Sequence, residues 1–284
     1  MAVNRIGYIY PLRTHDQRNG RCRPRPRFHP IALGLLALSV SSPLFAAAND
    51  AGAVLAQQRQ RIQAADYRVT GRLVNVDAKG VRTSYGLTIK AHWFPESLRI
   101  LVDITSPASA RQRVLLELQP NGEEKVYLTK PGDTAPKLVP ASRWNESFLN
   151  GDFGYEDFLE PEYFWPSQAD LGPTRRGARD CNLIKSTPAA SDPTRYSEVR
   201  TWLDNTIGFP VYAEKTLKTT GSVKEFTSID LRHEGGVWSA GQVQVDVRDK
   251  PGSTLLIIDR GSAKANLTMK DFSSATMAHF EGGL

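Results

Sequence analysis

Three acidic residues near the middle of the chain, Asp152, Glu156 and Asp157, form the grouping in this sequence that comes nearest to a catalytic pair. Two carboxyl groups can act as acid and base in glycoside hydrolysis when burial raises the pKa of one and the other stays ionised. Acids beside aromatic residues in a loop more often face solvent or cap backbone N–H groups. A carboxylate-based hydrolase is therefore the least favoured function, and we predict no catalytic residue.

Residues that could bind a metal or act as a nucleophile do not occur at the spacing that these sites require. His92, His233 and His279 occur singly, and Cys181 has no second ligand at the spacing of a zinc site. The chain has no Gly-x-Ser-x-Gly motif, and residues 205–208 indicate a hairpin turn instead. Glycine-rich phosphate loops are absent as well. We therefore expect a protein that is not an enzyme and that binds no metal or cofactor.

The first 48 residues have the pattern of a secretory signal peptide. An arginine-rich stretch at 21–27 precedes an apolar run at 31–40 and small residues at 46–48. An apolar run of about ten residues is too short for a membrane-spanning helix, which needs about 20. We predict an exported protein without a stable membrane anchor, cleaved between Ala46 and Ala48, with one domain at 49–284. The long basic region indicates an over-extended start.

Charge is balanced once this leader is set aside. Of the 36 Lys and Arg and the 30 Asp and Glu, residues 1–48 hold seven Arg and one Asp, which leaves 29 of each sign. The excess of basic residues thus comes from the leader and does not indicate a nucleic-acid partner, which would need a basic face on the mature domain. Cys22 also lies in the leader, so Cys181 has no partner for an intramolecular disulfide.

Alternation of apolar and polar residues dominates the chain after a predicted amphipathic helix at 49–65. Short turn-forming stretches separate the alternating runs, as in an antiparallel meander. Helical patterns between the runs are missing, which argues against a parallel sheet. We predict ten or eleven antiparallel strands. The runs are Tyr67–Leu73, Tyr85–Trp93, Leu98–Thr105, Val114–Leu118, Cys181–Lys185, Tyr196–Leu203, Pro210–Lys218, Glu225–Arg232, Gln242–Val247 and Leu255–Ile258.

A segment without a strand pattern, Pro131–Pro166, concentrates aromatic residues, and we call it the lid segment. Eight of the 25 aromatic residues in the chain lie within 22 of its positions. They are Trp144, Phe148, Phe153, Tyr155, Phe158, Tyr163, Phe164 and Trp165. Acidic residues are interleaved with these rings. Because a sheet of this size must cover its apolar face, we expect the rings to turn toward the sheet and the carboxylates to stay in water.

Residues 143–158 of this segment, RWNESFLNGDFGYEDF, resemble the W…SF(M)GSDFSYEDL signature of the LolA-like outer-membrane lipoprotein-sorting family. Leu149 and Asn150 stand where the family usually has Met and Gly. The residues that carry the motif are Ser147, Phe148, Gly151, Asp152, Phe153, Glu156 and Asp157. The resemblance continues at Tyr67–Arg72, Ile104–Pro107, Trp202–Asp204 and Gly208–Lys215.

The resemblance implies a mainly β fold: a half-open antiparallel barrel around an apolar cavity, closed by an N-terminal helix and a helical or loop lid. It implies a carrier in the Gram-negative periplasm that binds lipid or lipoprotein acyl chains, moves them toward the outer membrane and meets inner- or outer-membrane partner proteins. The lid residues that we predict are Trp144, Phe148, Phe153, Tyr155 and Phe158. The cavity residues that we predict are Leu73, Leu87, Ile89, Ile100, Val102, Val114 and Leu116.

Physical chemistry agrees with this implication, because each CH₂ group exposed to water costs about 0.8 kcal/mol and a soluble carrier must shield it. Two alternatives stay open. The same side chains could simply fill a core, as buried aromatic residues usually do. The half-barrel also resembles that of envelope sensors and of lipid-binding accessories that work with a membrane export system. A sensor is expected to carry an additional domain, for which we expect no room after the last predicted strands.

Overall fold

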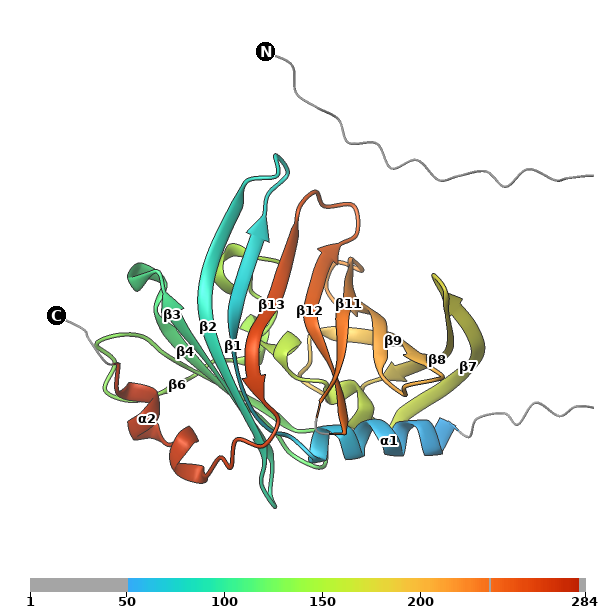
Figure 1. Ribbon diagram of the computed structural model, residues 1–284, viewed down its shortest axis with the longest axis horizontal. Coiled ribbons are helices and arrows are strands. Elements are labelled where there is room, and N and C mark those ends of the chain that lie inside the picture. The colour runs from blue at the N-terminus through green and yellow to red at the C-terminus, as the bar shows by residue number, and fades with distance from the viewer. Residues whose placement is uncertain (1–50, 235, 281–284) are drawn as a thin grey trace, which may run out of the picture. The chain divides into compact units, whose positions relative to one another are not determined.

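The computed structural model describes residues 51–234 and 236–280, so the predicted signal peptide lies outside the described part (Figure 1). This part opens with the helix α1 (Ala51–Gln63), close to the predicted helix. Thirteen strands of this part form one antiparallel sheet. They are β1 (Asp66–Val76), β2 (Arg82–Trp93), β3 (Leu98–Ser106), β4 (Gln112–Leu118), β5 (Glu124–Thr129), β6 (Lys137–Leu138), β7 (Ser167–Arg176), β8 (Arg179–Thr187), β9 (Tyr196–Asp204), β10 (Pro210–Leu217), β11 (Val223–Glu234), β12 (Val237–Val247) and β13 (Ser253–Ser262).

Short helical turns supply most of the remaining regular structure. Four 3₁₀ turns lie in the lid segment, one follows β3, and one precedes the short C-terminal helix α2 (Ser274–Ala278). The turns are η1 (Ala108–Ala110), η2 (Ala141–Arg143), η3 (Phe148–Asn150), η4 (Glu156–Phe158), η5 (Pro161–Phe164) and η6 (Met269–Phe272). Among the described residues, no helix combines the length and the apolar character needed to span a membrane.

The mainly β fold predicted from the sequence is confirmed, and each of the ten predicted runs is a strand. Three further strands, β5, β6 and β7, were not predicted. In β5 only two apolar residues follow the alternating pattern, and β6 consists of two residues. Most of β7 is exposed and contains Gly172 and Pro173, which is the composition of a sheet edge.

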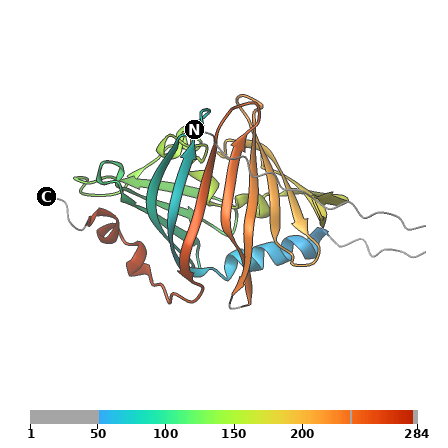
Figure 2. The same ribbon diagram turned by 45° about the horizontal axis from the view of Figure 1, so that its top comes forward.

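The strand order explains why the lid segment must cross the sheet. The order is β6-β5-β4-β3-β2-β1-β13-β12-β11-β10-β9-β8-β7, so the chain starts in the middle, runs out to one edge and returns from the other. The sheet therefore stays open at β6 and β7, and residues 139–166 connect these two edges. Figures 1 and 2 show the strands curling around this connection, with α1 along one end of the strands.

Strand register places aliphatic side chains side by side on one face, which we call the inner face. Ile89 pairs with Val102, and Val102 pairs with Val114. Because alternate residues of a strand point to the same side, these pairs continue as a row across β2, β3 and β4. Leu55 and Ile62 of α1 join the same buried cluster. The inner face and α1 therefore enclose the main apolar interior.

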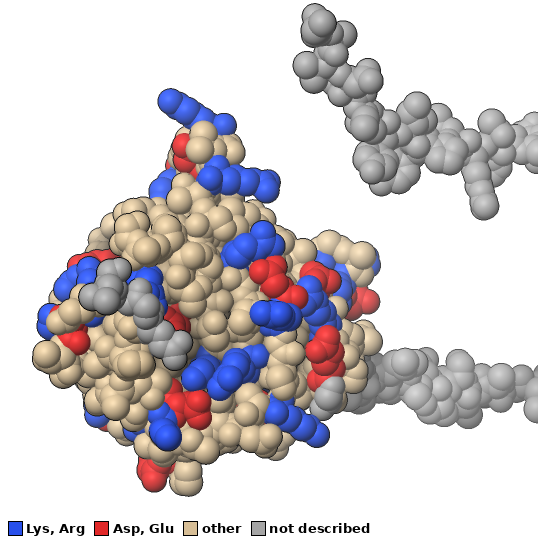
Figure 3. Space-filling model, turned by 60° about the vertical axis from the view of Figure 1, so that its left-hand side comes forward, with Lys and Arg blue, Asp and Glu red and all other residues tan. Residues whose placement is uncertain are grey.

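The C-terminal segment covers part of the opposite, outer face. Phe272 of η6 and Met277 of α2 are buried against Phe94, Leu101 and Leu115. Phe94 and Phe272 meet edge to face, with ring centroids 5.6 Å apart. Figure 1 shows α2 outside β3 and β4. Figure 3 shows one side of the molecule, on which Lys and Arg are interspersed with Asp and Glu. That face shows both signs of charge, in keeping with the balanced composition.

Candidate functional site

The seven predicted cavity residues all lie on the inner face. Each is at most 5% exposed, and all belong to one buried cluster. Leu73 comes from β1, Leu87 and Ile89 from β2, and the others from β3 and β4. These others are Ile100, Val102, Val114 and Leu116. The structure therefore brings the predicted residues together on four neighbouring strands.

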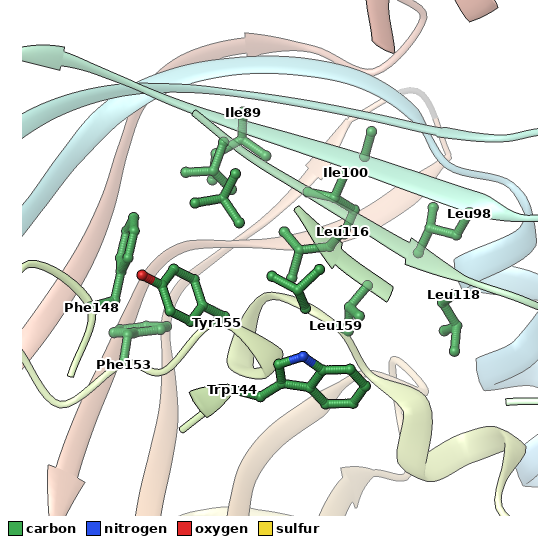
Figure 4. Close-up of a cluster of buried hydrophobic side chains, with 14 of the residues drawn as sticks. Ile89, Leu98, Ile100, Leu116, Leu118, Trp144, Phe148, Phe153, Tyr155 and Leu159 are labelled. Atoms are coloured by element: carbon green, nitrogen blue, oxygen red, sulfur yellow. The ribbon is translucent and has the colours of Figure 1, made fainter. Parts of the chain in front are cut away.

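The five predicted lid residues belong to or pack on the same cluster. Trp144, Phe148, Phe153 and Tyr155 are buried, and Phe158 is partly buried against them. Phe148 meets Tyr155 and Phe158 edge to face, with ring centroids 5.6 and 5.5 Å apart. Figure 4 shows Phe148, Tyr155 and Trp144 opposite aliphatic side chains of the inner face such as Ile89 and Leu116.

Rings thus occupy the space over the inner face in this conformation. Two hollows, of about 390 and 550 Å³, lie elsewhere in the described part. The first is lined by residues of β1, β13 and the loop after it, and the second by the turns that flank β11 and β12. Neither is lined by a predicted cavity residue. Because each predicted cavity residue is at most 5% exposed, a guest that contacts these residues would have to displace side chains that cover them.

Gly151 allows the lid segment to approach the sheet closely. A Cβ atom at Gly151 would lie 2.5 Å from Asn75 Oδ1 and 2.8 Å from Thr254 Oγ1. Asn75 Nδ2 donates to the carbonyl of Leu149 at 2.7 Å. Leu149 and Asn150 have φ angles of 53° and 61°, in the left-handed region. The family pattern places Gly at the second of these positions, where it would carry no strain.

Asp152 and Ser147 complete this attachment. The backbone N–H of Asp152 donates to Thr254 Oγ1 at 2.8 Å, and Lys250 Nζ lies 2.6 Å from Asp152 Oδ1. Ser147 Oγ donates to the carbonyl of Gly151. Further along, the backbone N–H of Phe148 donates to the carbonyl of Phe153 at 2.7 Å. Motif residues therefore fix a tight turn against β1 and β13.

The five acids interleaved with the rings, Asp152, Glu156, Asp157, Glu160 and Glu162, were expected to stay in water, and this expectation is wrong for four of them. The side chains of Asp152, Glu156, Asp157 and Glu162 are buried, and Glu160 is about one-third exposed. Polar partners from other strands make this burial tolerable, because a buried charge needs a counter-ion and hydrogen bonds. We use the name ionic cluster for Glu156, Asp157, Glu162, Lys215 and Lys224.

Asp157 has the most complete set of partners in the ionic cluster. Lys224 Nζ lies 2.8 Å from Asp157 Oδ2, which also accepts the Gly154 N–H at 2.7 Å. The Tyr196 hydroxyl donates to Asp157 Oδ1. Burial by itself would raise the pKa of Asp157, but the charges of Lys224 and Lys215 and the hydrogen bonds from Gly154 and Lys224 lower it. Asp157 is therefore an ionised anchor and not a proton donor.

Glu156 points to a different set of neighbours. Its Oε1 accepts from Asn145 Nδ2 at 2.7 Å, and its Oε2 accepts from Thr194 Oγ1 at 2.9 Å. Burial and the negative charge of Asp157 raise the pKa of Glu156. One raised and one lowered carboxyl group is the pattern of an acid and base pair. Both side chains, however, are buried, so neither group is open to a substrate in this conformation.

The lid segment ends in a second buried ion pair and in contacts with α1. Lys215 Nζ lies 3.3 Å from Glu162, and both side chains are at most 5% exposed. Burial lowers the pKa of Lys215, but Glu162 and Asp157 more than offset this and raise it. Arg61 of α1 pairs with Glu160 at 2.7 Å. This end is therefore held by charges from α1, β10 and β11.

Sequence reasoning missed Lys215 and Lys224 as partners of the motif acids. The sequence pattern could have indicated them, because both lysines alternate with apolar residues of the inner face. Lys215 follows Val211 and Ala213 in alternation, and Lys224 precedes Phe226. A lysine on an apolar face is a strong indication of a buried counter-ion.

The isolated histidines and the cysteine lie apart from this site. His92 Nδ1 is 3.1 Å from Asp66 Oδ1, His233 lies beside the Trp238 ring, and His279 caps α2. Cys181 is free and buried, and burial raises its thiol pKa. In the described ranges, no three His, Cys, Asp or Glu residues gather as metal ligands.

Solved structures share this architecture. A candidate outer membrane lipoprotein-sorting protein domain from Vibrio parahaemolyticus matches with a TM-score of 0.71 and 17% identity, over 80% of this chain and 99% of that one. A DUF1329 family protein from Desulfovibrio piger matches with a TM-score of 0.72 and 14% identity, over 80% and 97%. A LolA superfamily protein from Nitrosomonas europaea matches with a TM-score of 0.63 and 16% identity, over 80% and 98%.

These matches define the class of protein: the chain has the open, LolA-like β fold, which confirms the resemblance stated from the sequence. A family model described only as an uncharacterized protein matches residues 96–279, and the chain belongs to that family. None of the curated proteins matches the chain. The matched residues include the lid segment and most of the inner face.

Proposed function

We propose that this protein is a periplasmic carrier that shelters lipid acyl chains between the inner face and the lid segment. The observation that carries the proposal is the single buried cluster formed by the seven inner-face side chains and the lid rings. Within the described residues, no strand pairing joins residues 139–166 to the sheet. The rings therefore cover the inner face through side-chain contacts, which a guest can replace.

Exchange of rings for acyl chains is energetically reasonable. Burial of apolar surface contributes about 25 cal/mol per Å² whichever apolar group covers it. An acyl chain that replaces Phe148 or Phe153 over the inner face would restore most of the burial lost when the ring leaves. Such a carrier binds its cargo without binding it so tightly that release becomes impossible.

The remaining features fit this role. The LolA-like fold is the one that the lipoprotein-sorting and LolA superfamily structures also have. The leader predicted at 1–48 would deliver the chain to the periplasm, where inner- or outer-membrane partner proteins would load and unload it. Binding, rather than turnover chemistry, is the activity that we propose, with lipoprotein acyl chains as the first cargo and another lipid as the second.

Native mass spectrometry of the full chain, exported by its own leader and purified from periplasm without detergent, tests the proposal. We expect a second species, heavier by the mass of a lipid, that loses this mass on extraction with organic solvent. Recovery of the bare chain alone, from cells with a normal lipid content, would contradict the proposal.

A matched pair of variants locates the site. Val102→Thr adds a hydroxyl to the inner face, where burying it costs about 1–3 kcal/mol. Val74→Thr makes the same change on β1 one residue after Leu73, so it faces the outer side. We expect Val102→Thr to lower lipid loading several-fold and Val74→Thr to leave loading unchanged. Equal loading of both variants would place the lipid elsewhere.

A further inference from the structure

Glu124, the first residue of β5, is a buried acid on the inner face. It pairs with Leu118 in the register that also pairs Val126 with Leu116. Because Glu124 and Val126 are two residues apart on one strand, both side chains point to the inner side. Leu118 and Val126 are fully buried, and Glu124 is 5% exposed. Its charge also interacts with those of Glu156, Lys215 and Glu162, so Glu124 lies where the apolar cluster meets the ionic cluster.

Glu124 differs from the other buried acids of this region in having no hydrogen-bond partner. Both of its carboxyl oxygens are buried and unpaired within the described residues. Asp157 and Glu162 each have a lysine, and Glu156 has Asn145 and Thr194. A buried polar group without a partner costs about 1–3 kcal/mol. A leucine at this position would avoid that cost, so the acid requires another explanation.

The charge state of Glu124 shows what the group could offer to a guest. Burial and the negative charge of Glu156 raise the pKa of Glu124 well above its usual value. A protonated carboxyl group has one O–H donor and can also accept. It can therefore hydrogen-bond a hydroxyl, an amide or an amine in an otherwise apolar space.

We propose that Glu124 is the polar end of the binding site and that it hydrogen-bonds a hydroxyl, amide or amine of the guest. This inference rests on the proposed carrier function and names the cargo class more closely: acylated molecules with a hydrogen-bond donor next to the acyl chain. Leu116, Leu118 and Val126 would contact the chain itself. A guest without such a donor would leave Glu124 unpaired, and the site would discriminate against it.

Two probes of equal acyl length test this inference on the delipidated mature chain. 1-Monomyristoylglycerol carries two hydroxyl groups, and methyl myristate carries none. Each probe displaces a fluorescent fatty-acyl reporter, and the ratio of the two affinities is measured. The change of this ratio between wild type and variant is the readout, because it cancels the different water solubilities of the probes.

We expect Glu124→Leu to lower the ratio about tenfold, the size of one hydrogen bond of about 1.4 kcal/mol, and to keep the affinity for methyl myristate. Glu124→Gln should keep part of the preference, since an amide still donates and accepts. Thr129→Val is the matched control. It removes another buried, unpaired oxygen from β5, one on the opposite side of the strand, and should leave the ratio unchanged.

The outcomes separate the two proposals. An unchanged ratio in Glu124→Leu, with both probes still bound, would overturn the role of Glu124 and leave the carrier function standing. Failure of both probes to bind the wild-type chain would overturn both. Thermal denaturation checks the fold, and Glu124→Leu should be at least as stable as wild type. If it does not fold, the unbranched Glu124→Met makes the same comparison.

Discussion

The two ends of the lid segment attach to the sheet in chemically different ways. The end around Trp144 to Tyr155 covers the inner face with rings that pack on aliphatic side chains. The end from Glu156 to Glu162 meets β10 and β11 through buried lysines and α1 through Arg61. One segment thus combines an apolar contact and an ionic contact within about twenty residues.

The difference matters because the two contacts respond differently to a guest. Apolar contacts are non-directional, and an acyl chain can substitute for a ring. A buried ion pair has no such substitute, because separating it leaves an uncompensated charge. We therefore expect the ionic cluster, together with the hydrogen-bonded turn at 149–152, to fix where the lid segment lies, while the rings are the part that exchanges with cargo.

Lys224→Met should have the largest effect on stability. It removes the counter-ion of Asp157, whose side chain is fully buried, and leaves a charge without a partner. Breaking a buried pair in this way costs about 3–5 kcal/mol. Urea denaturation of the variant measures the loss in the free energy of unfolding.

The double variant Asp157→Leu with Lys224→Met is the control for this result. It removes both charges, and replacing a buried pair by apolar residues is often close to neutral. Recovery of most of the stability would show that the loss in Lys224→Met comes from the unpaired carboxylate. A double variant as unstable as the single one would show that side-chain packing or the hydrogen bonds that Asp157 accepts from Gly154 and Tyr196, not charge, hold this end.

Gly151→Ala should have the next largest effect. The added methyl group would lie 2.5 Å from Asn75 Oδ1 and 2.8 Å from Thr254 Oγ1, so the turn would have to move away from β1 and β13. Overpacking of this kind costs about 1–3 kcal/mol. The midpoint of thermal unfolding reports it. A cost near zero would mean that the motif turn shifts freely on the sheet.

The dependence of stability on pH should show two opposite slopes. Asp157 has a lowered pKa, so its contribution is present above the usual value of 3.8 and is lost as pH falls through the lowered one. Glu124 has a raised pKa, so its contribution is present below the usual value of 4.5 and is lost as pH rises through the raised one.

Glu124→Gln separates these slopes, because an amide does not titrate. We expect the variant to lose less stability than wild type as pH rises above 4.5, and to lose the same amount in acid. Glu156 and Glu162 also have raised pKa values. Part of the loss of stability above pH 4.5 is therefore expected in both proteins. Identical curves for the two proteins on the upper side would mean that the pKa of Glu124 is not raised in the folded state.

The fold was predictable where one strand face is apolar and the other polar, as in β2 with Leu87, Ile89 and Ala91. Such alternation depends only on the neighbouring layer, so it is visible in a single sequence. The edge strand β7 has no such signal. Its pairing comes from the adjacent β8, and a strand that covers no core needs no apolar face.

The apolar half of the candidate site was predictable, and the ionic half was not. The concentration of rings around Phe148 and Phe153 indicated a buried surface, because exposing so many rings would be costly. Burial of Asp157 depends on Lys224, which is 67 residues away in the chain. Only the fold brings these charges together, and an acid beside an aromatic residue otherwise favours a solvated position.

Glu146→Ala should have the smallest effect and tests whether burial is what distinguishes the ionic cluster. Arg143 and Glu146 lie in the same lid segment and form a two-bond pair at 2.8 Å, but their side chains are 50% and 48% exposed. Water and salt screen such a pair, so its loss should lower the free energy of unfolding far less than Lys224→Met does. Urea denaturation at low and high salt measures it. A loss as large as that of Lys224→Met would mean that any ion pair in the lid segment anchors it, and burial would no longer explain why one end is fixed.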